Sequence, residues 1–295
     1  MLYTLVKFFS SICCVLPAGV RRYAGNLLGE LCWTLIPKKR KKMAVNNIKI
    51  SLKVDQDKAE EIARKSATRF GRMFAEVLCM PKTNRNNIGQ FVRIEGAENL
   101  SEALSYGQGA VLATAHSGNW EILGAALAMN GFPLVAVVQK QTNAAMDRFI
   151  NEYRTMAGMH VTYKTGVREM VRMLGEGKII GLLMDQDQHS KGAFVEFFGR
   201  LASTPQGAAV LARMKDAPIV PAFITENSDG THTVIIHPIV KVNKTPDKER
   251  DVLETTAKIT KIIEQHIRKY PHEWFWLHNR WKTSPPREWK AESNE

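Results

Sequence analysis

The chain has 295 residues, of which 44% are hydrophobic and 24% are charged, and its formal net charge is +12. This length allows one large domain with a buried core, and the composition excludes an intrinsically disordered chain. The excess of positive charge indicates an anionic partner: nucleic acid, lipid head groups or an acidic carrier protein.

Residues 1–36 are rich in large apolar side chains, in the blocks "MLYTLVKFFSSICCVLP" and "NLLGELCWTLIP". Charged residues and prolines interrupt both blocks, whereas a simple spanning helix needs about 20 consecutive apolar residues. We therefore predict an interfacial or hairpin-like membrane anchor over residues 1–42, ending in the basic run Lys38 to Lys42, and one domain over residues 43–290. The basic residues would keep that domain on the cytoplasmic side. A buried amphipathic core helix is the alternative.

A long amphipathic helix is predicted from Val54 until Pro81, with Asp57 and Glu60 at capping-box-like spacing. Short β-rich runs then alternate with helical ones. The predicted strands are 91–96, 109–114, 133–138, 160–164, 178–187, 218–226 and 232–242, and the predicted helices are 119–131, 143–158, 167–177, 204–216 and 247–271. This alternation predicts an α/β fold with a mostly parallel sheet flanked by helices, in which the last two strands form an antiparallel edge.

In such a sheet, ligands bind at the carboxyl ends of the strands. The stretch "LATAHSGNWEILG" places His116 at the end of a strand and Glu121 at the start of a helix. Gly118 allows a tight turn, and Ser117 or Asn119 can cap the helix. With Glu121 orienting the imidazole, His116 becomes a general base, and main-chain amides of residues 117–119 could stabilise an oxyanion. The alternative is a hydrogen-bonded turn without chemistry.

Asp185 and Asp187 follow another buried strand, in "MDQDQH". We interpret both aspartates as substrate-binding residues, because two aspartates beside one histidine would be a set of low specificity for a metal. The aromatic residues of "GAFVEFFGR" fit core packing, or the lining of an acyl-chain tunnel: Phe194, Phe197 and Phe198.

The C-terminal stretch "WFWLHNRWK" contains Arg280 and Lys282 among three tryptophans. It fits a core plug, or a site at which these cations hold a phosphate of an acceptor lipid or an acidic face of a carrier protein. Arg200 is a similar candidate.

The segments "AHSGNWE", "MDQD", "FVEFFGRLASTPQGAAVLARMKDAPIVP" and "PHEWFWLHNRWK" together resemble the bacterial late lipid A biosynthesis acyltransferases, of the lysophospholipid acyltransferase superfamily, over roughly residues 20–285. The resemblance implies a glycerol-3-phosphate acyltransferase-like α/β/α fold at the cytoplasmic face of the inner membrane. It also implies transfer of a fatty acyl group from acyl carrier protein to a hydroxyl on a lipid A precursor, without a cofactor or metal. In the family's H-x4-[DE] motif the histidine is the base and the acidic residue its partner, which here are His116 and Glu121.

The chain departs from the family pattern after its second strand. Many members carry Arg-Pro there, whereas this chain has Gln139 and Lys140, so that Lys140 would act only as a point charge on the substrate. Related members acylate mannosylated inositol lipids, ornithine lipids or lysophospholipids. Acylation of a lysophospholipid or another glycolipid is therefore the alternative activity. A non-enzymatic membrane or nucleic-acid binder is a third hypothesis, but no nucleic-acid-binding motif organises the charge, and no nucleic-acid partner is expected.

Overall fold

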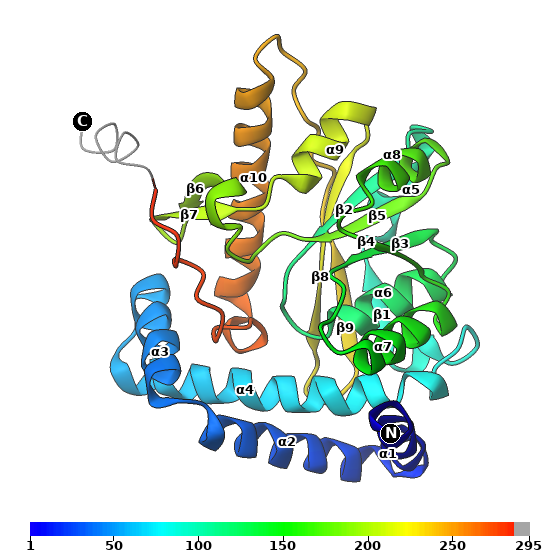
Figure 1. Cartoon of the computed structure of the whole chain (residues 1–295), viewed down its shortest axis with the longest axis vertical. Helices are drawn as coiled ribbons and strands as arrows, with labels where there is room; N and C mark the ends of the chain where they lie inside the picture. The colour runs from blue at the N-terminus through cyan, green and yellow to red at the C-terminus, as the bar shows by residue number, and fades with distance from the viewer. Residues whose placement is uncertain (286–295) are drawn as a thin grey trace.

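The computed structural model describes residues 1–285, within which a seven-stranded sheet carries helices on both faces (Figure 1). The strand order is β1-β9-β8-β2-β5-β3-β4. The last five strands of this order run parallel, β9 is antiparallel to β8, and β1 is parallel to β9. The strands are β1 (Val92–Glu95), β2 (Ala110–Thr114), β3 (Leu134–Val138), β4 (His160–Tyr163), β5 (Ile179–Leu183), β8 (Ile219–Glu226) and β9 (His232–Ile236). The predicted mostly parallel sheet is confirmed, although β1 lies outside β9 at the edge.

Strand β2 lies in the middle of the sheet, and all five of its residues are buried. Successive side chains of a strand point to opposite faces. Val111 therefore packs beneath α8, α9 and α10, whereas Leu112 packs beneath α5, α6 and α7. The covering helices are α5 (Ala97–Ser105), α6 (Trp120–Met129), α7 (Ala144–Met156), α8 (Val167–Gly175), α9 (Gly207–Lys215) and α10 (Lys248–Lys269).

Four helices precede the sheet and lie along one side of it (Figure 1): α1 (Leu2–Val15), α2 (Ala18–Leu35), α3 (Lys38–Leu52) and α4 (Gln56–Leu78). Helix α4 begins after Asp55, whose carboxylate accepts a hydrogen bond from the Lys58 amide at 2.8 Å, so the cap lies two residues before the predicted Asp57. Among residues 1–285, every helix is too short or too polar to cross a membrane. The domain boundary predicted at residue 42 falls inside α3.

Helix α2 packs unusually close to α4. A Cβ atom on Gly71 would lie 2.3 Å from the carbonyl oxygen of Gly25, and one on Gly29 would lie 2.5 Å from the Cα of Thr68. Only glycine allows the two backbones to approach this closely. The apolar N-terminal segment is thereby fixed to α4, the helix that also contacts Pro271–Glu273 near the C-terminal end of the described chain.

Three features were not predicted from the sequence: α3, α5 and the hairpin of β6 (Ala193–Phe197) and β7 (Arg200–Thr204). In this hairpin Phe198 and Gly199 form a two-residue turn, and both have positive φ, at 54° and 72°. Turns of this kind match the twist of the strands. Phe197 is buried against Trp274 and Trp281, which favours the packing interpretation of these aromatic residues.

Candidate active site

The candidate base His116 lies in the tight turn between β2 and α6. Gly118 has a φ of 63°, and a Cβ atom there would lie 2.2 Å from the carbonyl oxygen of Ile224, so the turn requires glycine at this position. Asn119 is the N-cap of α6, and its Oδ1 accepts a hydrogen bond from the Ile122 amide at 3.1 Å. The predicted strand, turn and capped helix are all present.

The partner of the His116 imidazole is Asp185. Its Oδ1 lies 2.8 Å from His116 Nδ1 and also accepts the His116 main-chain amide at 3.0 Å. Its Oδ2 accepts a hydrogen bond from Trp274 Nε1 at 2.8 Å. Burial by itself raises the pKa of Asp185, but its electrostatic interaction with His116 and the hydrogen bonds from His116 and Trp274 outweigh burial and hold this pKa below its usual value.

Because Asp185 is held as a carboxylate, Nδ1 of His116 carries the hydrogen and donates it. This leaves Nε2 as the basic nitrogen, and among residues 1–285 no side chain is hydrogen-bonded to it. The imidazole side chain is 20% exposed and contacts the Trp120 ring edge to face, with 4.9 Å between centroids. The arrangement can accept a proton from a substrate hydroxyl, with Asp185 stabilising the imidazolium that forms.

Among the described residues no hydrogen bond or ion pair joins Glu121 to His116, which corrects the predicted pairing. Its two carboxylate oxygens are hydrogen-bonded to Nε and Nη2 of Arg154 on α7, at 2.8 and 2.6 Å. Trp120 Nε1 donates to the same carboxylate at 3.1 Å. Glu121 does lie in the first turn of α6 as predicted, but its side chain points across to α7. It therefore joins two helices behind the site and positions the turn only indirectly.

Main-chain hydrogen bonds join the His116 turn to residues 273–275, which we call the C-terminal segment. The Gly118 amide donates to the carbonyl of Glu273 at 2.9 Å, and the Phe275 amide donates to the carbonyl of His116 at 3.1 Å. The Ser117 amide donates to the Ala115 carbonyl at 2.8 Å. The amides of Ser117 and Gly118 are thus already engaged, which corrects the expectation that they stabilise an oxyanion. The Ser117 hydroxyl is buried and has no partner among the described residues.

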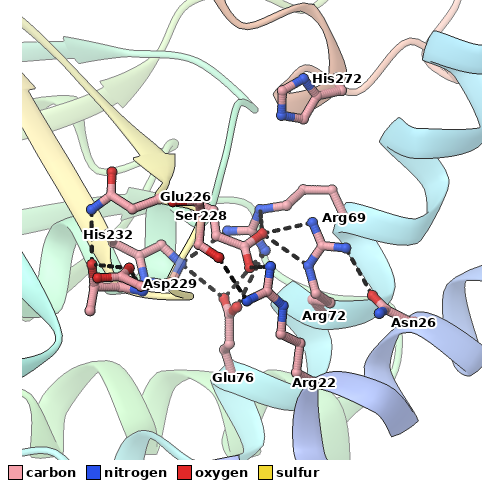
Figure 2. Close-up of polar contacts among 12 residues, drawn as sticks. Arg22, Asn26, Arg69, Arg72, Glu76, Glu226, Ser228, Asp229, His232 and His272 are labelled. Carbon is pink, nitrogen blue, oxygen red and sulfur yellow. Dashed lines mark hydrogen bonds and ion pairs between the residues drawn. The ribbon is translucent and has the colours of Figure 1, made fainter. Parts of the chain in front are cut away.

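A buried network of ion pairs joins this C-terminal segment to α4. Arg69 Nε donates to Glu273 at 2.9 Å, and Figure 2 shows Arg69, Arg72 and Glu76 of α4 converging on Glu226 and His232. Burial alone would lower the pKa of Arg69, but the three surrounding glutamates raise it. Burial likewise opposes ionisation of Glu76, yet Arg69 and His232 outweigh it and lower the pKa of Glu76.

This network also reaches the start of α6, because Asn119 Nδ2 donates to Glu76 at 2.8 Å. Arg72 donates to Glu226 from Nε and Nη2, at 2.9 and 2.7 Å. The charged groups compensate each other within the interior, as buried ions must. Nothing local in the sequence marks Arg69, Glu76 or Glu273 as members of one network, and the sequence reasoning missed them together with Arg154.

Asp187 forms hydrogen bonds with His278 and Thr283, which follow the C-terminal segment in the chain. Its amide donates to His278 Nε2 at 3.0 Å, and its Oδ2 accepts from the Thr283 hydroxyl at 2.9 Å. Because His278 Nε2 accepts this bond, its imidazole is neutral there, and burial lowers the pKa of His278. Asp187 therefore fixes residues 278–283 beside the site.

The predicted cationic contacts lie in different places. Arg280 is buried and donates to the Ser203 carbonyl and the Thr204 hydroxyl, while Arg200 stacks on Trp281 with 3.5 Å between Cζ and the ring centroid. Lys282 is exposed next to this pair. Lys140 is also exposed, at the end of β3, two strands from β2. Arg200 and Arg280 thus both contact the aromatic rings around Phe197 and Trp281, whereas Lys140 lies at the end of a different strand.

The model of the bacterial lipid A biosynthesis acyltransferase family matches residues 1–283 of the chain. The chain belongs to this family. The enzyme is therefore an acyltransferase, and the resemblance on which the sequence interpretation rested is confirmed.

Three curated relatives indicate the breadth of this acyltransferase family. A phosphatidylinositol mannoside acyltransferase of Mycolicibacterium smegmatis is 27% identical over 76% of this chain and 74% of its own length. The lipid A biosynthesis palmitoleoyltransferase of Escherichia coli is 24% identical over 92% of this chain and 87% of its own. The lauroyltransferase of the same organism is 24% identical over 67% and 64%.

Proposed function

We propose that this acyltransferase moves a fatty acyl group from acyl carrier protein to a hydroxyl of a lipid A precursor, with His116 as the general base. The observation that carries the proposal is the pairing of His116 Nδ1 with Asp185, which leaves Nε2 as a partly exposed base. The formal net charge of +12 complements an acidic carrier protein and an anionic acceptor lipid.

In the proposed reaction, donor and acceptor are bound together. Nε2 of His116 takes the proton of the acceptor hydroxyl as its oxygen attacks the thioester carbonyl carbon. A C–O bond forms, the C–S bond breaks, and the leaving thiolate takes the proton back from Nε2. The products are an ester and a free thiol, and His116 returns to its starting state without forming a covalent intermediate.

The remaining predicted contacts take different roles in this proposal. Asp185 orients the base, and Ser117, Gly118 and Asn119 build its turn, so none of the four needs to bind substrate. Lys140 and Lys282 are exposed cations that we assign to the anionic acceptor. Glu121 keeps α6 in place through Arg154.

Membrane association through α1 and α2 belongs to the same proposal. Their outward faces carry large exposed apolar side chains, with Phe8 61%, Tyr23 71% and Leu27 60% exposed. The basic run Lys38 to Lys42 follows directly at the start of α3, and α1 and α2 lie together below α4 in Figure 1. An apolar helix face beside a basic cluster fits a bilayer surface with anionic lipids. We place the enzyme at the cytoplasmic face of the inner membrane.

The mycobacterial relatives favour a second acceptor class. The name of the 27% identical relative assigns it phosphatidylinositol mannoside as substrate. A mannosylated inositol lipid is therefore the alternative acceptor, and a lysophospholipid is a third possibility for the same chemistry.

Acyl transfer by the full-length protein in phospholipid vesicles tests the proposal. Acylated acyl carrier protein is offered with a lipid A precursor, a phosphatidylinositol mannoside or lysophosphatidic acid, and the products are identified by mass spectrometry. We expect transfer to the lipid A precursor and a loss of about 10³-fold or more in His116→Ala. His160→Ala is the matched control, because His160 is exposed at the opposite end of the sheet. Retained turnover in His116→Ala would reject the base.

A further inference from the structure

Arg200 lies against polar side chains of α3 and against Trp281. Its Nη2 donates to the Ser51 hydroxyl at 2.9 Å and its Nη1 to Asn47 Oδ1 at 3.4 Å, both on α3. Its Nε is buried and has no partner among residues 1–285, and the same holds for Asn47 Nδ2 and Trp281 Nε1. The Cζ atom of Arg200 lies over the Trp281 ring, 3.5 Å from its centroid. We call Asn47, Arg200 and Trp281 the Arg200 cluster.

All of the unsatisfied atoms of the Arg200 cluster are donors. Buried donors without partners are rare in native proteins, and several in one place call for an acceptor from outside the chain. Arg280, the residue before Trp281, adds a fourth buried donor without a described partner, its Nε. What the cluster lacks is therefore a group that accepts several hydrogen bonds at once.

The region also carries two guanidinium groups, and the carboxylates of Asp185 and Asp187 act on that of Arg280 through space. Within the described residues neither Arg200 nor Arg280 forms an ion pair, and burial lowers the pKa of Arg200 with no acidic group acting against it. Burial lowers the pKa of Arg280 to about 10, so it remains a cation near neutral pH. A third guanidinium, that of Arg268, reaches the Ser51 carbonyl at 3.3 Å, but Glu264 compensates it.

We propose that the Arg200 cluster binds a phosphate group of a substrate. A phosphate presents several strong acceptor oxygens and two negative charges, and a guanidinium fork binds it through parallel hydrogen bonds. The Arg200 side chain as a whole is only partly buried, and each of its Nη atoms carries a second N–H besides the one that donates to α3. The cluster rests on the proposed function, because its phosphate would come from the acceptor lipid or from the phosphopantetheine arm of the donor.

Contacts between aromatic rings connect the Arg200 cluster to the residues around His116. Phe197 contacts Trp281 on one side and Trp274 on the other, at centroid distances of 5.7 and 5.6 Å. Trp274 in turn donates to Asp185. One layer of aromatic rings therefore separates the Arg200 cluster from the catalytic pair.

Binding of inorganic phosphate to the full-length protein gives a first test that does not depend on activity. Phosphate should raise the midpoint of thermal unfolding of the wild type and of His116→Ala, and Arg200→Gln should lose the shift. Arg250→Gln removes the same charge from an exposed position on α10 and should keep it. Asn47→Asp supplies a carboxylate beside Arg200, so it should raise the midpoint without phosphate and abolish the response. A wild type that does not respond, or an unchanged response in Arg200→Gln and Asn47→Asp, would overturn the site.

Kinetics then identify the source of the phosphate. If the phosphate belongs to the acceptor, Arg200→Gln should raise KM about tenfold or more for a phosphorylated acceptor and leave KM unchanged for the dephosphorylated one. If it belongs to the donor, the same contrast should appear between acyl-phosphopantetheine and acyl-pantetheine. Equal KM changes in both arms would overturn the substrate assignment. Failure of the proposed function looks different: no acceptor is acylated, while the response of unfolding to phosphate persists.

Discussion

Replacing Asp185 by Asn should reduce kcat for acyl transfer by about 10³-fold. The carboxylate lies 2.8 Å from His116 Nδ1 and is buried. At about 4 Å between charge centres and an effective dielectric constant of about 20, it stabilises the developing imidazolium by about 4 kcal/mol, which corresponds to about 10³ in rate. Asn fills the same space but carries no charge, and its amide can favour the wrong tautomer of His116.

The assay is single-turnover acyl transfer at saturating donor and acceptor, with thermal unfolding measured in parallel. Asp216→Asn is the matched control, because Asp216 is 70% exposed and precedes β8 at the opposite end of the sheet. Wild-type rates in Asp185→Asn, with the fold intact, would refute the proposal that Asp185 stabilises the protonated imidazole of His116.

Glu121→Gln distinguishes the observed pairing of His116 with Asp185 from the predicted pairing of His116 with Glu121. Glu121 and Arg154 are 8% and 13% exposed, and breaking a buried ion pair costs about 3–5 kcal/mol. The midpoint of thermal unfolding should therefore fall by about 5–8 °C, with a smaller loss of kcat than in Asp185→Asn. If Glu121→Gln lost as much activity as Asp185→Asn at unchanged stability, the corrected assignment would be wrong.

Two further predictions concern the membrane face and the interior. The double variant Leu27→Asp, Leu31→Asp should bind anionic vesicles at least tenfold more weakly in a flotation assay, because both leucine side chains are exposed on α2. Met214→Asp, at an exposed position on α9, is the control and should bind like the wild type. Equal binding by the double variant and the wild type would contradict the proposed membrane face. Burial, together with the electrostatic effects of His237 and Lys269, lowers the pKa of His266 from 6.5 to about 3. As the pH falls below about 6.5, the imidazole of His266 therefore takes up a proton in the unfolded state but not in the folded state. Relative to His266→Phe, wild-type stability should therefore fall by about 2 kcal/mol between pH 6.5 and 5, measured by urea unfolding, and parallel pH curves would reject this.

Local pattern alone was enough for much of the sheet and for the His116 turn. The apolar run before His116, the glycine within "HSGN" and the cap at Asn119 encode a strand, a turn and a helix within a few residues. Helix α3 escaped prediction because its basic first half has no apolar periodicity, and only Ala44, Val45 and Ile48 of this helix are buried as apolar residues. The β6–β7 hairpin escaped because Phe198, a bulky residue, occupies a positive-φ turn position.

The sequence by itself determined that His116 ends a buried strand and that Glu121 begins the following helix. Only the tertiary structure decided their partners. Asp185 reaches His116 because β5 pairs beside β2, which brings together loops that are 69 residues apart in sequence. Glu121 turns to Arg154 because α7 packs next to α6. Hydrogen bonds between such loops depend on the strand order and helix packing of the whole sheet, and neither is written in the spacing of a short motif.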